Sequence, residues 1–525
     1  MPASATLPLD ARAPLAALRL TAGGVLAAAL LLGGGTPQGL PGDAIVIAAG
    51  LMLGVLLVRA WPQADLAAYR VELLLLAGVL ILPLLQLIPL PPLLWTSLAG
   101  RAALVADQTA AGIGPHWAPL TLDPAGTWRA WLALLPGAAL FVTALILPRR
   151  DLERLTLLIP LLALAGALLG FAQMAGGPDS PLRFYAYTHR DSAVGFFANR
   201  DHFSDLLNVG LLLAAAWLIA LWQRHAAHRD LPALAVAGWS LVLATLLVGL
   251  MLARSRAGVG LGLAGLAGIG LLAWRAGRSA PRLTRRVLLV MLVALILALQ
   301  YGLYAVLSRL QQDPFDDARW WILRTTVAAA RHYGLAGSGF GSFVHVLPQF
   351  QTRATLIPQY VNHAHDDWLE LWLEGGIPAA LLMAAFVVWW AWRSVQAWHP
   401  SHDREQALPA SHDRDQARLP TRDRDQAFTA SLDREHALPA SHDRDQTRLP
   451  TRDREPPADE PLSVLLPRAA ALGILLLLIH AVVDYALRTL AIEATLAILC
   501  AWLARAADPR HAPPRRSAPP EILSS

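Results

Sequence analysis

Residues 360–370 (YVNHAHDDWLE) place two histidines and three carboxylates between long apolar runs. Ionisable side chains beside a bilayer are costly to keep and usually serve a function. From about Asp366 the pattern becomes helical, which puts His365 at a helix start, where the positive end of the helix dipole disfavours an imidazolium. A neutral histidine there could act as a general base near neutral pH. The alternatives are helix capping, hydrogen bonding to headgroups, and a metal site with His363, which lacks the helical HExxH spacing.

Two groups of arginines are candidates for binding an anion. Arg254 and Arg256 lie in the short turn ARSRAG on the outer side, against the usual bias of arginine toward the cytoplasm. Guanidinium groups suit bidentate phosphate recognition, although snorkelling to lipid headgroups is the alternative. Arg319 and Arg324 open the longest outer connection, and because they are five residues apart, at most one is expected to meet a buried ligand.

Two further polar groups flank predicted spans. In the stretch GFFANRDHF, an interfacial aromatic belt explains the phenylalanines better than it explains Asn199, Arg200 and His202. In the stretch HAVVDYALR, Asp484 and Arg488 share a short outer turn, and they form either a structural ion pair or a binding contact. The glycine-rich residues 334–341 lack the strand and the Lys-Ser/Thr ending of a phosphate-binding loop, and they are predicted to be a compact turn.

These residues are spaced along a membrane protein. The chain has 525 residues, of which 55% are hydrophobic and 15% are charged, and its mean hydropathy is +0.44. A soluble protein carries about 25% charge. Runs of roughly 18 or more apolar residues recur, each about long enough to cross a ~30 Å hydrocarbon core. The sequence therefore predicts an all-α, polytopic membrane helical bundle of about twelve spans, near residues 15–34, 43–60, 71–90, 129–147, 153–175, 203–222, 231–252, 257–274, 287–307, 377–395, 463–482 and 488–504.

Arginines orient the predicted spans, because cytoplasmic loops carry the positive excess. They gather in every second connection, which places both termini in the cytoplasm and puts the connections near 91–128, 176–202, 253–256 and 308–376 outside. The cytoplasmic set is Arg59, Arg70, Arg149, Arg150, Arg154, Arg224, Arg229, Arg275, Arg278, Arg282, Arg285, Arg286, Arg505, Arg510, Arg515 and Arg516.

One cytoplasmic connection differs in kind. From Ser401 the sequence repeats about every ten residues (SHDREQALPA, SHDRDQARLP) and contains few large apolar side chains, which predicts a disordered linker; a partner-binding array is the alternative. The predicted organisation is a membrane bundle over 1–398 that includes the large periplasmic loop 308–376, a disordered repeat linker over 399–461, two last spans over 462–505, and a disordered cytoplasmic tail over 506–525.

The polar motifs together resemble those of the O-antigen ligase and polymerase superfamily of membrane glycosyltransferases. The matching segments, in chain order over residues 190–490, are GFFANRxHF, SRAG, RWW, GxGxF, NHAHDxWLxxxxExG and HxxxDxxLR. The resemblance implies a multi-pass protein of the bacterial inner membrane that uses a glycan on undecaprenyl diphosphate. It implies a lipid, glycan or protein acceptor, an inverting transfer without metal or other cofactor, and no nucleic-acid partner.

Residue roles follow from the same resemblance. His365 would be the base, and Arg256 and Arg319 would bind the diphosphate. This chain has Asp366 where the family commonly has asparagine, which leaves the role of Asp366 open. The other substrate-binding candidates at the outer surface are Arg254, Asn199, Arg200, His202, His363, Asp366, Asp484 and Arg488.

Several functions stay open at this point. Ligation, polymerisation of repeat units and protein O-oligosaccharide transfer are not separated within the superfamily. A transporter, such as the bicarbonate transporters named in the same superfamily, should carry ionisable or broken-helix features near span centres. A scaffold would act through the cytoplasmic repeats. The placement of the notable charges at outer span ends favours the enzyme.

Overall fold

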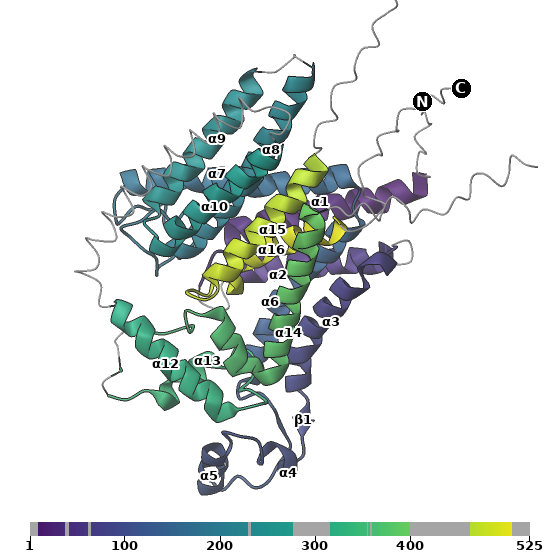
Figure 1. The fold of residues 1–525 in the computed structure, drawn as a ribbon. Helices are drawn as coiled ribbons and strands as arrows, with labels where there is room; N and C mark the ends of the chain where they lie inside the picture. The colour runs from purple at the N-terminus through teal and green to yellow at the C-terminus, as the bar shows by residue number, and fades with distance from the viewer. Residues whose placement is uncertain are drawn as a thin grey trace, which may run out of the picture. The chain divides into compact units, whose positions relative to one another are not determined.

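The computed structural model describes residues 9–36, 41–60, 65–228, 233–276, 315–353, 355–356, 360–399 and 462–506. Within these ranges the chain is an all-α polytopic membrane protein, as predicted (Figure 1). Ten helices in these ranges are long and apolar enough to cross a membrane. They are α1 (Leu9–Leu32), α2 (Pro41–Ala60), α3 (Arg70–Gln86, continuing η2 Ala67–Tyr69), α6 (Pro124–Ile146), α7 (Arg149–Ala175), α8 (Arg200–His228), α9 (Ala233–Leu252), α10 (Arg256–Ala276), α14 (Asp367–Trp398) and α15 (Leu462–His480).

Two of the about twelve predicted spans are not among these ten helices. The predicted span at 287–307 and the decapeptide repeats lie outside the described residues. The last predicted span corresponds to α16 (Leu490–Arg505), which has 16 residues, fewer than the roughly 20 that usually cross a bilayer.

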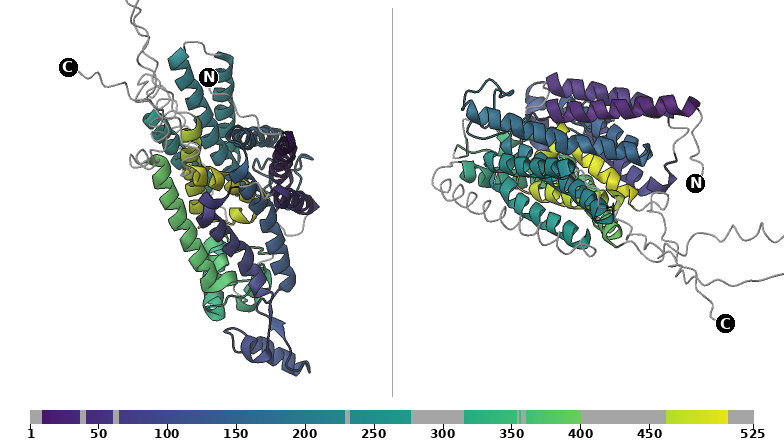
Figure 2. Two further views of the ribbon diagram at one scale, coloured as in Figure 1. Left: turned by 90° about the vertical axis from the view of Figure 1, so that its right-hand side faces the viewer. Right: turned by 90° about the horizontal axis from the view of Figure 1, so that it is seen from above.

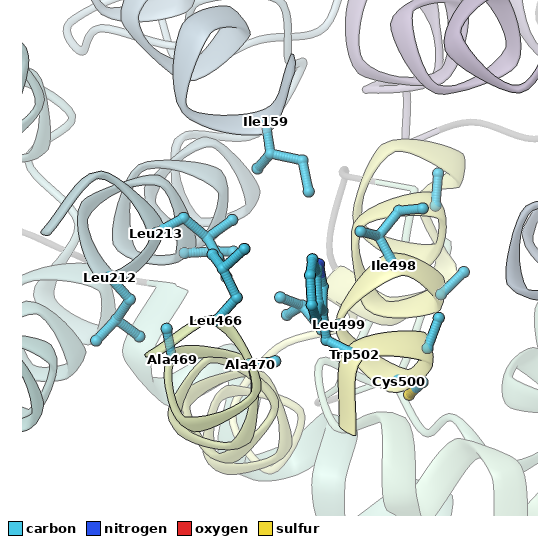
Figure 3. Packing of buried hydrophobic residues seen from close by; sticks show 14 of the residues in the cluster. Ile159, Leu212, Leu213, Leu466, Ala469, Ala470, Ile498, Leu499, Cys500 and Trp502 are labelled. Atoms are coloured by element: carbon cyan, nitrogen blue, oxygen red, sulfur yellow. The ribbon is translucent and has the colours of Figure 1, made fainter. Parts of the chain in front are cut away.

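Helices α8 and α15 lie at the centre of the packing. Their candidate spans are 83% and 72% buried, whereas those of α2, α3 and α9 are 22% or less buried. Around α8 and α15 the core consists of interdigitated leucine, isoleucine and alanine side chains from α7, α8, α15 and α16 (Figure 3). Trp502 of α16 donates from its indole N–H to the Thr156 hydroxyl of α7 at 2.7 Å, so even the polar atom of this large side chain is satisfied. Helices α1 and α2, drawn in purple, pack side by side at the edge (Figure 2).

The connections that are predicted to lie outside are folded where the structure describes them. Residues 87–123 contain the short antiparallel pair β1 (Pro89–Leu90) and β2 (Ala118–Pro119), with α4 (Pro92–Trp95) and α5 (Ala102–Ala110). The described part of the predicted loop 308–376 contains α12 (Phe315–Tyr333), α13 (Phe343–Val346) and η4 (Leu347–Phe350). A second small apolar core joins α12, α13 and the start of α14 through Ile322, Phe343 and Leu373. This connection is therefore largely helical where it is described.

A break in α14 separates its outer part from its membrane part. Gly376 has φ 61° and ψ −151°, a conformation that side-chain-bearing residues rarely adopt. The glycine-rich turn 334–341 docks against this break, because Ser338 N–H and Gly339 N–H donate to the carbonyls of Leu373 and Glu374 at 2.9 Å. A Cβ on Gly337 would lie 2.5 Å from the Glu374 carbonyl oxygen, so a glycine is required there.

Candidate functional site

His365 and Asp484 meet at the end of the bundle where α14 begins and α15 ends. His365 precedes α14, Asp484 follows α15, and the imidazole Nδ1 lies 3.1 Å from the Asp484 carboxylate. Asp366 caps α14 by accepting from Leu369 N–H at 2.9 Å, which confirms the predicted helix start. His365 itself has φ 53°, a left-handed conformation unusual for histidine. Such a conformation persists only where the surroundings fix it, which is common at functional sites.

The other oxygen of Asp484 faces α8. His202 Nε2 lies 3.7 Å from it, and the Asn199 side-chain amide donates to it at 3.5 Å. Burial acts to raise the pKa of Asp484, but the interactions with His202 and His365 outweigh burial and hold it well below its usual range. Asp484 is therefore a carboxylate shared by two histidines.

The ring of Tyr485 contacts three histidines. Its ring centroid lies 4.4 Å from that of His363, 4.8 Å from that of His202 and 4.9 Å from that of His365. Its hydroxyl interacts with the side chains of Asn362 and Asn199, and burial is the main cause that raises its pKa. Nothing in the sequence singled out Tyr485, because its partners come from three separate segments.

His363 is held internally. Its Nδ1 donates to Glu370 at 2.8 Å, and the second Glu370 oxygen accepts from Ala364 N–H at 2.6 Å. Burial lowers the pKa of His363 more than Glu370 raises it. The structure therefore shows His363 hydrogen-bonded within the protein. A contact of His363 with substrate stays a prediction.

Arg488 is also engaged inside the protein. Its guanidinium lies 2.9 Å from Glu374, 3.1 Å from Glu370 and 3.3 Å from Asp367. Although burial acts to lower the pKa of Arg488, these three carboxylates raise it. Among the described residues, Arg488 thus pairs with these three carboxylates, whereas Asp484 pairs with His365 and His202. The ion pairs are structural, but they are not the Asp484–Arg488 pair that the sequence suggested.

This ion-pair cluster predicts a large loss of stability on substitution. Arg488→Met should lower the free energy of unfolding by about 3–5 kcal/mol, because it leaves buried carboxylates without their cation. The measurement is thermal unfolding of the purified protein in detergent. Arg324→Met is the matched control, since Arg324 is exposed and lies over the Trp320 ring at 5.7 Å. Equal stability of the two variants would contradict the structural role.

Asp201 connects the arginine candidates. It lies in the first turn of α8, and its carboxylate is 3.6 Å from Arg319 Nη2 of α12. It also hydrogen-bonds with the Ser255 side chain, and Arg256 follows Ser255 as the first residue of α10. Arg319 remains 38% exposed. Asp201 thus contacts Arg319 and the residue that precedes Arg256, although these two arginines are far apart in sequence.

Arg254 and Arg200 hold the connection between α7 and α8. Arg254, with φ 53°, donates to the Asp191 carbonyl at 2.9 Å. Arg200 donates to the Ser192 hydroxyl at 3.4 Å, and its guanidinium is 4.0 Å from the Asp191 carboxylate. Through these contacts the two arginines hold the connection beside the site. A contact of either arginine with substrate stays a prediction.

The structure adds His189, which sequence reasoning missed, and a buried partner for His480, the first residue of the HAVVDYALR stretch. His189, in the connection 176–199, interacts electrostatically with Arg200, Asp201 and Asp484; burial and Arg200 lower its pKa to about 4. His480 binds both oxygens of Asp205 at 2.7 Å, deeper in the bundle. Only the polar character of these segments could have indicated them.

The comparisons with known proteins agree with the motifs. Residues 239–384 match the family model described as O-antigen ligase. This stretch runs from α9 into α14 and contains Arg256, Arg319 and His365, so the family resemblance is confirmed over it. No curated protein matches the chain.

Proposed function

From the O-antigen ligase match and the His365–Asp484 pair, we propose that this protein is a membrane glycosyltransferase. It moves a glycan from undecaprenyl diphosphate to an acceptor hydroxyl at the periplasmic face of a bacterial inner membrane. The single observation that carries the proposal is that the His365–Asp484 pair lies near the Arg319–Asp201 pair, since the two carboxylates interact electrostatically. The transfer needs a base and cations together.

His365 is the proposed base. When its Nδ1–H donates to Asp484, Nε2 is the nitrogen that accepts a proton from the acceptor hydroxyl. The hydroxyl oxygen then bonds to the anomeric carbon while the bond from that carbon to the diphosphate oxygen breaks. Asp484 stabilises the imidazolium that forms, since its carboxylate stays ionised.

Arg256 and Arg319 are the proposed ligands of the leaving group. Negative charge grows on the diphosphate as the bond breaks, and guanidinium groups fixed beforehand stabilise that charge. Asp201 supports this role by holding Arg319 at 3.6 Å and Ser255, next to Arg256, through a hydrogen bond. The acceptor would complete the site beside His365, which is 15% exposed.

Two features weigh on the transporter alternative. A transporter breaks helices near the bilayer midplane, whereas the break in α14 is contacted by Gln86 at the outer end of α3, whose side-chain amide donates to the Glu374 carbonyl at 2.9 Å. The buried Asp205–His480 pair lies within the spans. However, His480 is only four residues from Asp484 along the chain. Both features connect to the outer site, which favours the enzyme.

The assay that tests this proposal measures the release of undecaprenyl diphosphate from the donor. Purified protein given undecaprenyl diphosphate-linked glycan and an acceptor should release undecaprenyl diphosphate at the same rate with and without chelator, because arginines neutralise the leaving group. Product is measured by mass spectrometry against a no-acceptor control. Loss of release in chelator that a divalent ion restores would overturn the metal-free mechanism, and no release under any condition would overturn the proposed function.

A further inference from the structure

Residues 183–190, in the connection between α7 and α8, form a fixed segment at the outer surface. Arg183 Nη1 donates to the carbonyls of His189 and Ser192 at 3.0 and 2.9 Å, and its Nη2 donates to the Arg190 carbonyl at 2.7 Å. The guanidinium group of Arg183 thus donates hydrogen bonds to three backbone carbonyls. The backbone of the segment is held in place before any ligand binds, which lowers the entropic cost of binding.

Three buried polar atoms of this segment lack a hydrogen-bond partner in the part of the chain that the structure describes: Arg183 Nε, Thr188 Oγ1 and His189 Nδ1. The last two belong to adjacent residues. Buried polar atoms in folded proteins are almost always hydrogen-bonded. The unpartnered atoms of Thr188 and His189, in a segment whose backbone is held in place, therefore point to a polar ligand that would hydrogen-bond with them.

The chemistry of these groups favours a sugar over a phosphate. Because its pKa is lowered to about 4, chiefly by burial and Arg200, the His189 imidazole is neutral at physiological pH, and so it both donates and accepts. The Thr188 hydroxyl does the same. Sugar hydroxyls also donate and accept, whereas diphosphate oxygens only accept and are better matched by the arginines.

Two exposed aromatic residues lie close to Thr188 and His189 in the sequence. Tyr187 is 84% exposed, and Phe184, 59% exposed, stacks on Phe196 with centroids 6.3 Å apart and planes 10° apart. Aromatic faces beside a few polar groups are typical of sites for ligands with both apolar and polar faces, and sugar rings have both.

The segment adjoins the proposed diphosphate site. His189 interacts electrostatically with Asp201, the carboxylate that holds Arg319. Arg254, two residues before Arg256, donates to the Asp191 carbonyl just beyond the segment. A sugar bound here would thus be close to a diphosphate on Arg256 and Arg319.

We propose that residues 183–190 form a carbohydrate subsite for the donor's sugar next to the diphosphate, in which Thr188 and His189 hydrogen-bond its hydroxyls and Tyr187 stacks on its ring. This inference rests on the proposed function and adds a sugar-recognition element to it. The sugar could instead belong to the acceptor, and the test separates these two sources.

The test compares two ligands of the full-length protein in nanodiscs. Thr188→Val and His189→Ala should each weaken binding of undecaprenyl diphosphate-linked glycan about three- to tenfold, the usual effect of one lost hydrogen bond, while leaving binding of undecaprenyl diphosphate unchanged. Thr109→Val is the matched control, because Thr109 lies on exposed α5 and its hydroxyl donates to the Val105 carbonyl. Tyr187→Ala should weaken glycan binding, whereas Trp117→Ala, at an aromatic residue 64% exposed in another outer connection, should not.

Each outcome decides the proposal. Equal weakening for both ligands, or none for either, would overturn the sugar subsite. A raised KM for the acceptor with unchanged donor binding would overturn the assignment to the donor. Failure of the unsubstituted protein to bind undecaprenyl diphosphate would overturn the proposed function itself, and that result is seen before any variant is compared.

Discussion

Replacing His365 with asparagine should reduce glycan transfer by about 10²–10⁴-fold, the usual contribution of a general base. Asparagine is chosen because it tolerates the left-handed conformation that His365 adopts at φ 53°, so the backbone is kept while the base is removed. The measurement is kcat for transfer by purified protein, with thermal unfolding as the check on folding. Transfer within a fewfold of the unsubstituted rate would remove His365 from the catalytic role.

His363 supplies the control for this result. It lies two residues away, and its imidazole is bound to Glu370 at 2.8 Å rather than to Asp484. His363→Gln should lower the unfolding temperature more than the turnover of the protein that remains folded. Equal loss of turnover in both variants, with normal unfolding, would instead point to a shared role for the two histidines.

Arg256→Ala and Arg319→Ala should each strongly weaken donor use. Truncating one partner of a partly desolvated charged contact costs roughly 2–5 kcal/mol, which is about 30-fold to several thousandfold in kcat/KM for the donor. Lysine at either position should restore only part of the activity, because it lacks the planar fork that binds phosphate in two places. The readout is kcat/KM measured at limiting donor.

Arg324→Ala is the matched control on the same helix. Arg324 lies five residues beyond Arg319, which puts it on a different face of the helix; it is exposed and contacts the Trp320 ring. It should leave donor use unchanged, in agreement with the prediction that at most one of the two arginines meets a ligand. Full activity in both the Arg256 and Arg319 variants would contradict their assignment.

Local patterns predicted much of the fold. Apolar runs predicted the ten spans that the structure describes, because the length of a hydrocarbon core and the hydrogen bonds within one helix are local constraints. The start of α14 after Asp366 was also readable, since a capping carboxylate acts within three residues. Within the predicted connection 308–376, the structure adds a helix over residues 315–333 that the sequence analysis did not delimit.

The sequence by itself determined that ionisable residues gather at the ends of apolar spans, and it brought out His365, Arg256 and Arg319 as candidates. Only the tertiary structure decided which charges are already neutralised inside the protein. His365 meets a carboxylate 119 residues away, and Arg488 meets Glu374 at a separation of 114 residues. The physical reason is that such partners are set by how α8, α14 and α15 pack against one another, which depends on side chains along their whole length. A local pattern carries no information about that packing, so Arg488 and Arg319 look alike in the sequence and differ in the fold.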